Sequence, residues 1–227
     1  MNLKYYCTNF KKKSIQFLFN GFKKAFKTMS VKDLKILKIS SKKKQSPKAM
    51  IISCCDSRVN VEKIFSAKHG ELFIHKNIAN LVPAYKNKNL NCSTAAALEY
   101  GTLVLEVPAL IILGHSKCGG IRAYSENQLG LDNNKPSLPF VNKWLKILKP
   151  CFSKNLVLKD VKATVKYLEK AALTESLKNL RTYPFIKERE ENKKLIILAL
   201  LYDIENGELF LLNEENKVFS KINGKLS

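Results

Sequence analysis

Three side chains of the kinds that bind soft divalent metals follow two apolar segments of the chain. Cys54 comes directly after the apolar run 49–53, and His115 and Cys118 follow the run 109–113. Two thiolates and one imidazole suit Zn²⁺, and three protein ligands leave one position of a tetrahedral metal open. An open position is typical of a catalytic zinc site, whereas a structural site is closed by a fourth ligand. The pattern therefore indicates a catalytic site with one Zn²⁺ per chain.

The same residue types also have a simpler interpretation as core. A buried Cys at a strand end is more often a packing residue than a ligand, and an isolated H-x-x-C is weak evidence. Cys55 is an alternative ligand to Cys54. Asp56 and Arg58 favour the metal interpretation, because an acid and a base so close to a candidate ligand, directly after a buried strand, indicate a charged pair at the site.

The elements that must position these residues are short apolar strands alternating with helices. This order predicts an α/β fold with a mainly parallel central sheet flanked by helices. In open sheets of this class, ligand sites lie outside the carboxyl ends of the strands, so the residues after 53 and 113 can meet there. We expect strands at 49–53, 72–74, 109–113, 195–200 and 208–212, with a hairpin turn at 205–207.

Apolar residues at helical spacing predict the helices. Ser93 is the expected N-cap of a helix that runs to 103, with Gly101 as a weak point inside it. Gly119 and Gly120 let the backbone turn tightly into a helix from 121. The remaining helices are expected at about 34–39, 138–148 and 156–180.

A further helix is predicted near the N-terminus by apolar residues that recur on one side of a helical wheel. With lysines elsewhere on the wheel, this helix should lay an aromatic stripe on the body of the protein, on a partner subunit or on a membrane surface. The stripe consists of Ile15, Leu18, Phe19, Phe22 and Phe26.

The net charge of +21 raises the question of nucleic-acid binding, but its composition argues against it. Only four of the forty basic residues are Arg, the side chain favoured for phosphate and base-edge recognition. Residues 1–50 contain fourteen Lys and one acid, a net charge of +13. We interpret this excess as a solvated basic face rather than a phosphate-binding arm.

Length and cysteine use predict a single domain in a reducing compartment. A chain of 227 residues suits one domain with an attached arm, and its longest apolar run, 195–202, falls far short of the roughly 20 residues that cross a bilayer. Six cysteines in a chain of this length form no dense disulfide framework, so we expect a cytoplasmic protein. A transit peptide stays open, because the first 32 residues lack acids, although they also lack Arg.

Four ordered segments resemble the β class of carbonic anhydrases. Residues 54–59, C-C-D-S-R-V, resemble the family's C-x-D-S-R-V, and residues 114–120, G-H-S-K-C-G-G, resemble its G-H-x-x-C-G-G. Between them, residues 70–80 are similar to its G-E-x-F-x-x-R-N-x-x-N, and residues 96–100 to its helix before the third strand. The resemblance extends from about residue 18 to residue 209, most of the chain.

The resemblance implies a role for each site residue. Cys54, His115 and Cys118 are similar to the zinc ligands, with Cys54 rather than Cys55 in that role because the first position of the motif is the ligand. Asp56 and Arg58 resemble the family's dyad. Paired with Arg58, Asp56 leaves the fourth zinc position to water; released, it binds the metal and stops the reaction.

The implied activity is the hydration of CO2 to bicarbonate. Zinc lowers the pKa of its bound water toward about 7, and the hydroxide so formed attacks CO2. Val82 and Gly119 are the residues expected to face the substrate.

The resemblance also implies a dimer or a multiple of dimers. Residues 15–227 are then one domain whose helical arm, 15–45, packs across the dimer, and residues 1–14 are a basic extension outside the match. Two positions depart from the bicarbonate-inhibited branch of the family: Ile51 replaces its Trp and Lys76 its Arg. Lys supplies charge but not a guanidinium fork, so that regulatory site is in doubt.

Two other functions remain to be weighed. A carbonyl sulfide or carbon disulfide hydrolase would use the same scaffold and metal on another linear triatomic substrate. A basic nucleic-acid-binding protein with structural zinc would bind with steep salt dependence, but it leaves Asp56 and Arg58 without a role. We therefore expect small-molecule substrates and neither nucleic acid nor membrane as partners.

Overall fold

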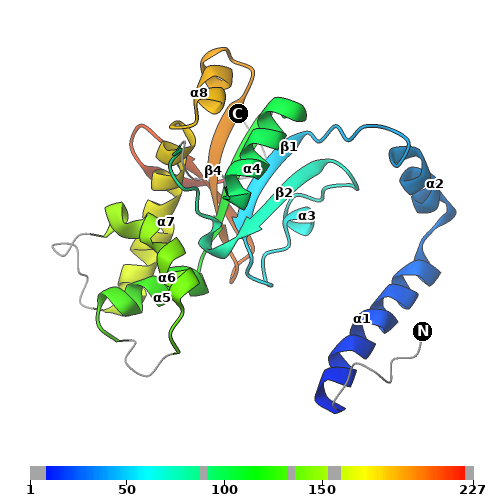
Figure 1. Cartoon of the computed structure of the whole chain (residues 1–227), viewed down its shortest axis with the longest axis horizontal. Helices are drawn as coiled ribbons and strands as arrows, with labels where there is room; N and C mark the ends of the chain where they lie inside the picture. The colour runs from blue at the N-terminus through cyan, green and yellow to red at the C-terminus, as the bar shows by residue number, and fades with distance from the viewer. Residues whose placement is uncertain (1–8, 87–90, 132–135, 153–159, 223–227) are drawn as a thin grey trace. The chain divides into compact units, whose positions relative to one another are not determined.

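The computed structural model describes residues 9–86, 91–131, 136–152 and 160–222, and the side chains only from residue 16 onward. It divides into two compact units, Met1–Gln45 and Ser46–Ser227. The first unit contains α1 (Asn9–Thr28) and α2 (Val31–Ser40), and the second contains the sheet and the remaining helices (Figure 1). Most of the predicted extension 1–14 lies outside the described residues.

The N-terminal helix predicted from the aromatic spacing is confirmed. The large apolar side chains of α1 that the structure describes are 37% to 74% exposed: Phe17, Leu18, Phe19, Phe22 and Phe26. The helix therefore buries no described residue of its stripe within its own unit. The Ile15 side chain lies outside the described residues. The helix predicted at 34–39 lies within α2, which begins with a capping box between Ser30 and Asp33 and also buries no residue.

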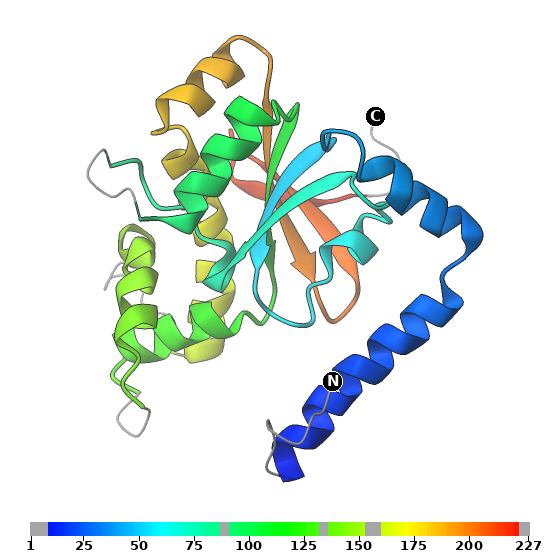
Figure 2. The same ribbon diagram turned by 45° about the vertical axis from the view of Figure 1, so that its right-hand side comes forward.

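The second unit is built on a six-stranded sheet in the order β2-β1-β3-β4-β5-β6. The first four strands are parallel, and the last two extend the sheet as antiparallel hairpins, which confirms the predicted mainly parallel sheet. Figure 2 shows its twist. The strands are β1 (Ala49–Cys54), β2 (Leu72–Asn77), β3 (Ala109–His115), β4 (Ile196–Asp203), β5 (Glu208–Asn213) and β6 (Val218–Lys221).

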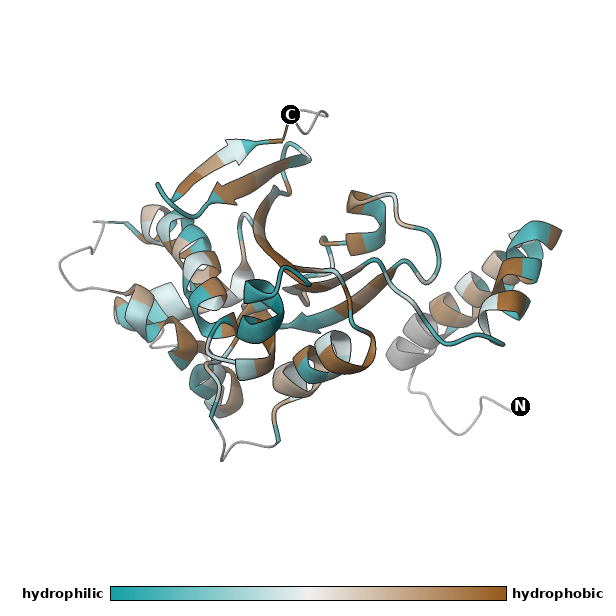
Figure 3. Ribbon diagram, turned by 90° about the horizontal axis from the view of Figure 1, so that it is seen from above, coloured by the Kyte–Doolittle hydropathy of each residue, from teal (hydrophilic) through white to brown (hydrophobic). Residues whose placement is uncertain are grey.

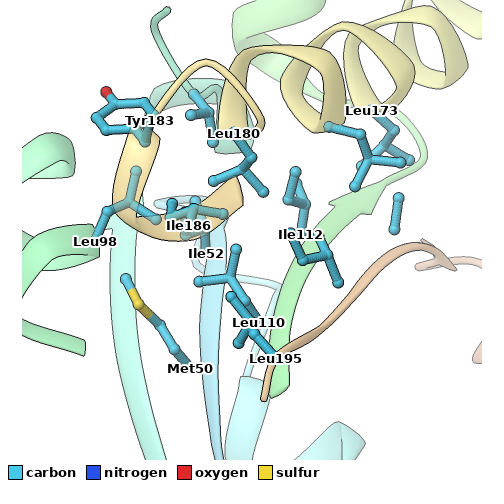
Figure 4. Packing of buried hydrophobic residues seen from close by; sticks show 14 of the residues in the cluster. Met50, Ile52, Leu98, Leu110, Ile112, Leu173, Leu180, Tyr183, Ile186 and Leu195 are labelled. Atoms are coloured by element: carbon cyan, nitrogen blue, oxygen red, sulfur yellow. The ribbon is translucent and has the colours of Figure 1, made fainter. Parts of the chain in front are cut away.

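Alternating residues of the central strands face two different hydrophobic clusters. Met50 and Ile52 of β1 pack with α4 (Ser93–Glu99), α7 (Val161–Leu180) and α8 (Pro184–Glu191), as in Figure 4, whereas Ile51 packs with the short α3 (Val61–Ile64) on the other side. All six residues of β1 are buried, as expected for a strand with neighbours on both sides and cover on both faces. The central strands are accordingly the most uniformly brown part of Figure 3.

Helices connect and cover the strands. Among the described residues, the second unit has these helical segments besides α7 and α8: α3 (Val61–Ile64), η2 (Ile78–Asn80), α4 (Ser93–Glu99), η3 (Tyr100–Val104), α5 (Gly119–Gln128), α6 (Pro139–Leu145) and η4 (Lys146–Cys151). The longest, α7 (Val161–Leu180), is followed by α8 (Pro184–Glu191). No helix among the described residues has the length and apolar content that a membrane span requires.

Gly101 lies where the helix after β2 approaches the sheet. A Cβ at this position would lie 2.6 Å from the Met50 sulfur, so the glycine permits the close contact between helix and β1. Gly101 was expected to weaken the helix, and the α-helix does end just before it: α4 passes into the π-helical η3 at Tyr100.

Three predicted boundaries are wrong. Ser93 is the first helical residue and not the cap; the N-cap is Cys92, whose side chain makes no capping bond. The helix expected at 138–148 is α6 followed by the 3-10 helix η4, because in a continued α-helix the ring of Pro150 would clash with the carbonyl of Lys146. The described part of the helix expected at 156–180 begins only at Val161, capped by Asp160; residues 156–159 lie outside the described residues.

Candidate metal centre

The candidate site lies where the strand order reverses. From β1 the chain continues to β2 on one side and then to β3 and β4 on the other. At such a switch point the loops after two adjacent parallel strands diverge and leave a crevice for a ligand. Cys54 is the last residue of β1 and His115 the last of β3, so the sheet brings the two side by side.

The sheet and the loop after β3 gather three possible metal ligands. The Sγ atoms of Cys54 and Cys118 and a ring nitrogen of His115 all lie within 4.8 Å of one another, and the two sulfurs are 3.9 Å apart. All three residues are buried, with exposed fractions of 4%, 1% and 1%. Cys55 is exposed and does not belong to the cluster.

The ring of His115 presents one nitrogen without a protein partner. Its Nδ1 lies 2.9 Å from the carbonyl oxygen of Ser116, to which it donates. Its Nε2 is buried and has no hydrogen-bond partner among the described residues; the Asp56 carboxylate is 4.0 Å away. Buried polar atoms are normally paired. A bare imidazole nitrogen beside two thiols is the donor set that Zn²⁺ takes, so these residues fit the metal.

The two thiols differ in their proton affinity. The hydrogen bond from the Cys118 thiol and the neighbouring His115 lower the pKa of Cys54. The same contact and burial raise the pKa of Cys118, although the N–H groups of Gly120 and Ile121 at the start of α5 act in the opposite direction. The pocket thus favours one thiolate by itself, and a metal that takes both sulfurs must displace the remaining proton.

Beside this cluster, Asp56 and Arg58 form a two-pronged ion pair. The guanidinium donates from Nε to Oδ1 at 2.9 Å and from Nη2 to Oδ2 at 2.7 Å. These bonds hold the pKa of Asp56 well below its usual range, so the carboxylate is ionised. Arg58 Nη2 also donates to the carbonyl oxygen of Lys117 at 3.0 Å, which ties the pair to the loop that carries Cys118.

The loop between His115 and Cys118 is fixed by the turn after β4. Ser116 donates from its hydroxyl to Asp203 at 2.8 Å and accepts the N–H of Ile204, and Lys117 forms an ion pair with Glu205. Lys117 has a φ of 57°, a left-handed conformation that costs a non-glycine residue energy unless its surroundings enforce it. The predicted turn at 205–207 is confirmed and anchors this loop.

The two glycines after Cys118 differ in their surroundings. A Cβ on Gly120 would lie 2.9 Å from a methyl carbon of Ile78 and 3.2 Å from the Cβ of Ala79, so α5 begins in close contact with η2. A Cβ on Gly119 would meet no atom within 4 Å. Gly119 borders a cavity of about 1090 Å³, which also reaches Arg58.

Val82, the other residue expected at the substrate, lies elsewhere. Its side chain is fully buried in the cluster that contains Ile52 and Leu98, and it does not line the cavity. Its neighbour Leu81 instead packs in the cluster that contains Cys54 and Cys118.

Lys76 and Ile51, the two positions that depart from the bicarbonate-inhibited branch, both lie next to Val59. Lys76 donates from Nζ to the carbonyl oxygen of Val59 at 2.8 Å, and Ile51 packs with Val59 in the same cluster. The lysine therefore contacts the backbone that follows the dyad.

The sequence did not reveal Glu169 or Asp203 as site residues. Glu169, from α7, accepts a hydrogen bond from the backbone N–H of Cys118 at 2.9 Å and is 7% exposed. Burial raises its pKa, and the N–H groups of Cys118 and Lys117 oppose that rise. The available signal was its position in an apolar row, one residue after Leu168 and three before Ala172.

Comparisons with known proteins give the same answer as the geometry. Residues 49–209 match the sequence model of the carbonic anhydrase family. The chain is also 38% identical over 188 residues to β carbonic anhydrase 3 of Arabidopsis thaliana, covering 80% of this chain and 70% of that protein. This chain belongs to the β-carbonic anhydrase family. Members of the family are lyases that hydrate CO2 with zinc, and the Cys54–His115–Cys118 cluster is the corresponding place for the metal.

Two solved β-carbonic anhydrases share the fold. The enzyme CcaA superposes with a TM-score of 0.81 at 26% identity, over 94% of each chain. One from Sordaria macrospora, described as tetrameric, superposes with a TM-score of 0.65 at 25% identity, over 89% of this chain and 95% of that one. The predicted family and fold class are confirmed.

Proposed function

We propose that this β-carbonic anhydrase catalyses the reversible hydration of carbon dioxide to bicarbonate and a proton, with one Zn²⁺ per chain on Cys54, His115 and Cys118. The observation that carries the proposal is the buried cluster of two thiols and an unpartnered imidazole nitrogen beside an aspartate–arginine pair. Zinc bound there supplies the Lewis acidity that lets water ionise near neutral pH.

The dyad is proposed to keep the fourth ligand position free. Arg58 grips both oxygens of Asp56, and that carboxylate stays 4.0 Å from the Nε2 of His115. Asp56 remains ionised in this grip, so it can accept a hydrogen bond and orient the attacking oxygen toward CO2. Without Arg58 the carboxylate would be free to turn to the metal and block the site.

The substrate needs an apolar surface next to the ligands. Ala79 and Leu81 pack in the same cluster as Cys54 and Cys118 and are fully or almost fully buried. We propose Gly119 as the residue that faces CO2, because it follows a ligand, borders the cavity and leaves open space where a side chain would stand.

We further propose that two copies of the chain, or a multiple of two, form the working enzyme, with the arm 15–45 of one copy across the other. The stripe of α1 is exposed, and on the sheet face opposite α4 and α7 several apolar residues are only partly buried, among them Ile74, Ile111 and Leu211. Among the described residues, α3 is the only helix that packs on this face. A partner's arm would cover both surfaces. The tetrameric Sordaria macrospora relative agrees with such an assembly.

The proposed compartment is the cytoplasm. All five cysteines in the described part of the chain are free thiols, which suits a reducing environment. Fractionation of cells that express the chain, with detection in the soluble fraction, tests this assignment; recovery in an organelle fraction would replace it.

One experiment tests the proposed activity directly. The purified protein should contain about one zinc per chain and hydrate CO2, and removal of the zinc with a chelator should abolish the activity until zinc is restored. Carbonyl sulfide and carbon disulfide are assayed beside CO2 under the same conditions. A higher rate on either sulfur compound would replace CO2 as the substrate while leaving the metal site intact.

A further inference from the structure

A buried carboxylate that belongs to none of the family motifs contacts the backbone of a proposed metal ligand. Glu169 lies in the middle of α7, in a row of buried apolar residues that includes Val165, Leu168 and Ala172. A carboxylate in such a row is costly unless hydrogen bonds compensate it. The bond from the Cys118 N–H to Glu169 Oε1, at 2.9 Å, provides that compensation.

The residue that receives this support is the one whose position is least secured by the sheet. Strand pairing holds Cys54 against Asn77 and His115 against Tyr202, whereas Cys118 comes after β3 has ended. The residue before it, Lys117, holds the left-handed φ of 57°. Cys118 is also the N-cap of α5, but its side chain makes no capping bond, and its sulfur instead lies 3.9 Å from the Cys54 sulfur.

Other contacts hold the earlier part of the loop but not Cys118 itself. Ser116 is tied to Asp203, and the Lys117 carbonyl accepts from Arg58. Among the described contacts, Glu169 is the one side chain from outside the loop that bonds the backbone N–H of Cys118.

We propose that Glu169 is a positioning residue for the metal site: its carboxylate oxygen fixes the backbone of Cys118 so that the sulfur is held in place for zinc. This inference rests on the proposed zinc site and adds to it a residue from α7, 51 positions further along the chain. The role depends on a hydrogen-bond acceptor at the end of this side chain and not on contact with the metal.

The test measures how fast zinc leaves, without reference to catalysis. Zinc-loaded protein is mixed with excess chromogenic chelator and zinc release is followed by absorbance. Glu169→Ala should release zinc about 10–100-fold faster than the wild-type protein, the usual effect of removing a group that supports a ligand. Glu169→Gln keeps an acceptor oxygen at the same reach and should stay within about threefold of wild type.

A matched variant separates positioning from general loss of stability. Leu177 lies on the same helix and is buried in the cluster with Ile52, whereas Cys118 belongs to a different hydrophobic cluster. Leu177→Ala should lower the unfolding midpoint at least as much as Glu169→Ala, yet release zinc at close to the wild-type rate. Should Glu169→Ala not fold, Glu169→Asp replaces it: the shorter side chain keeps the charge but loses reach, and it should release zinc faster than Glu169→Gln.

Three results would overturn the proposal. They are a wild-type release rate in Glu169→Ala or Glu169→Asp, equally fast release from Glu169→Gln and Glu169→Ala, and fast release from Leu177→Ala. If the wild-type protein itself binds no zinc, the proposed function fails instead, and the two failures are distinguished by the metal content of the starting protein.

Discussion

The Nδ1 atom of His115 lies 2.9 Å from the carbonyl oxygen of Ser116, the next residue in the chain. Because a carbonyl oxygen only accepts hydrogen bonds, Nδ1 carries the proton and Nε2 is left with a free lone pair. The loop backbone itself thus selects the tautomer that a metal requires.

Removing single cysteines should identify the ligands. Cys118→Ser and Cys54→Ser should each lose most of the zinc, because two donors hold it far less tightly than three. Cys55→Ser is the control, since this neighbour is exposed and outside the cluster, and it should keep the metal. Zinc content per chain after dialysis decides the point. Loss of metal from Cys55→Ser with retention by Cys54→Ser would reverse the assignment.

Breaking the dyad should separate metal binding from activity. Arg58→Ala should keep about one zinc per chain but lower CO2 hydration by about 100-fold or more, because the freed Asp56 can occupy the metal. Arg58→Lys should recover only part of the activity, since an ammonium cannot grip both oxygens. Asp56→Ala should also retain zinc and lose rate. Near-normal hydration by Arg58→Ala or Asp56→Ala at neutral pH would remove the pair from the mechanism.

The two glycines after Cys118 provide a matched steric test. Gly120→Ala should destabilise the protein by about 1–3 kcal/mol and lower zinc content, because its Cβ overlaps Ile78 and displaces the start of α5. Gly119→Ala has open space and should unfold at nearly the wild-type urea concentration with zinc bound. Its hydration rate then reports whether this position faces CO2. Equal stability of both variants would contradict the contact between α5 and η2.

An ion-pair cluster away from the metal should give stability a pH dependence. Arg181 bonds Glu190 through two nitrogens at 2.8 Å and also pairs with Glu214, whose pKa it lowers. A carboxyl with a lowered folded-state pKa adds stability above its unfolded value near 4.5, and this contribution is lost as the pH falls through the folded pKa. Arg181→Ala should therefore cost about 1–2 kcal/mol at pH 7, a value reduced by the exposure of the pair.

The same penalty should shrink steadily below about pH 4.5, when Glu214 becomes protonated. Urea unfolding of zinc-free protein at pH 7, 5 and 4 measures it without interference from metal loss. Lys178→Ala, which removes an exposed lysine 3.9 Å from Glu175, is the control and should show no such trend. A penalty independent of pH would mean that Arg181 acts through packing alone.

Two truncations should test the proposed arm. Deletion of residues 1–14 should leave zinc, activity and oligomeric state unchanged, whereas deletion through Lys27 should dissociate the assembly and reduce activity. The longer deletion removes the apolar stripe. The surface of the partner subunit that the stripe is proposed to cover would then be exposed to water, which costs on the order of several kcal/mol. Light scattering on both proteins gives the mass. A long truncation that stays a fully active dimer would mean that the stripe packs on something else.

The cluster of candidate ligands was predictable because its chemistry and its position coincide in the sequence. Cys54 and His115 stand where apolar runs stop, and the end of a buried parallel strand is where a ligand site is expected. Glu169 gave no comparable local signal. Lysines flank it at 166 and 170, so its charge is typical of a solvated helix, and its partner lies 51 residues away in the sequence.

The boundaries that failed depend on local competition that composition does not reveal. Ser93 has the side chain of a cap, but Cys92 adopts the extended backbone of the N-cap and the helix begins one residue earlier than expected. The short β6 was missed because its four residues include only two apolar ones; it forms by pairing with β5. In both cases neighbouring structure, rather than intrinsic preference, decides the outcome.

The candidate ligands span two strand ends, and this has a consequence for how the chain is made. Cys54 leaves the ribosome 64 residues before Cys118, so the complete set exists only once β3 has been synthesised and has paired with β1. A metal bound to both segments links the two ends of the chain between Cys54 and Cys118. The entropy cost of closing that loop then no longer opposes the pairing of β1 with β3. The yield of folded enzyme should therefore depend on zinc available during synthesis, and zinc added to the finished chain should be a poorer substitute.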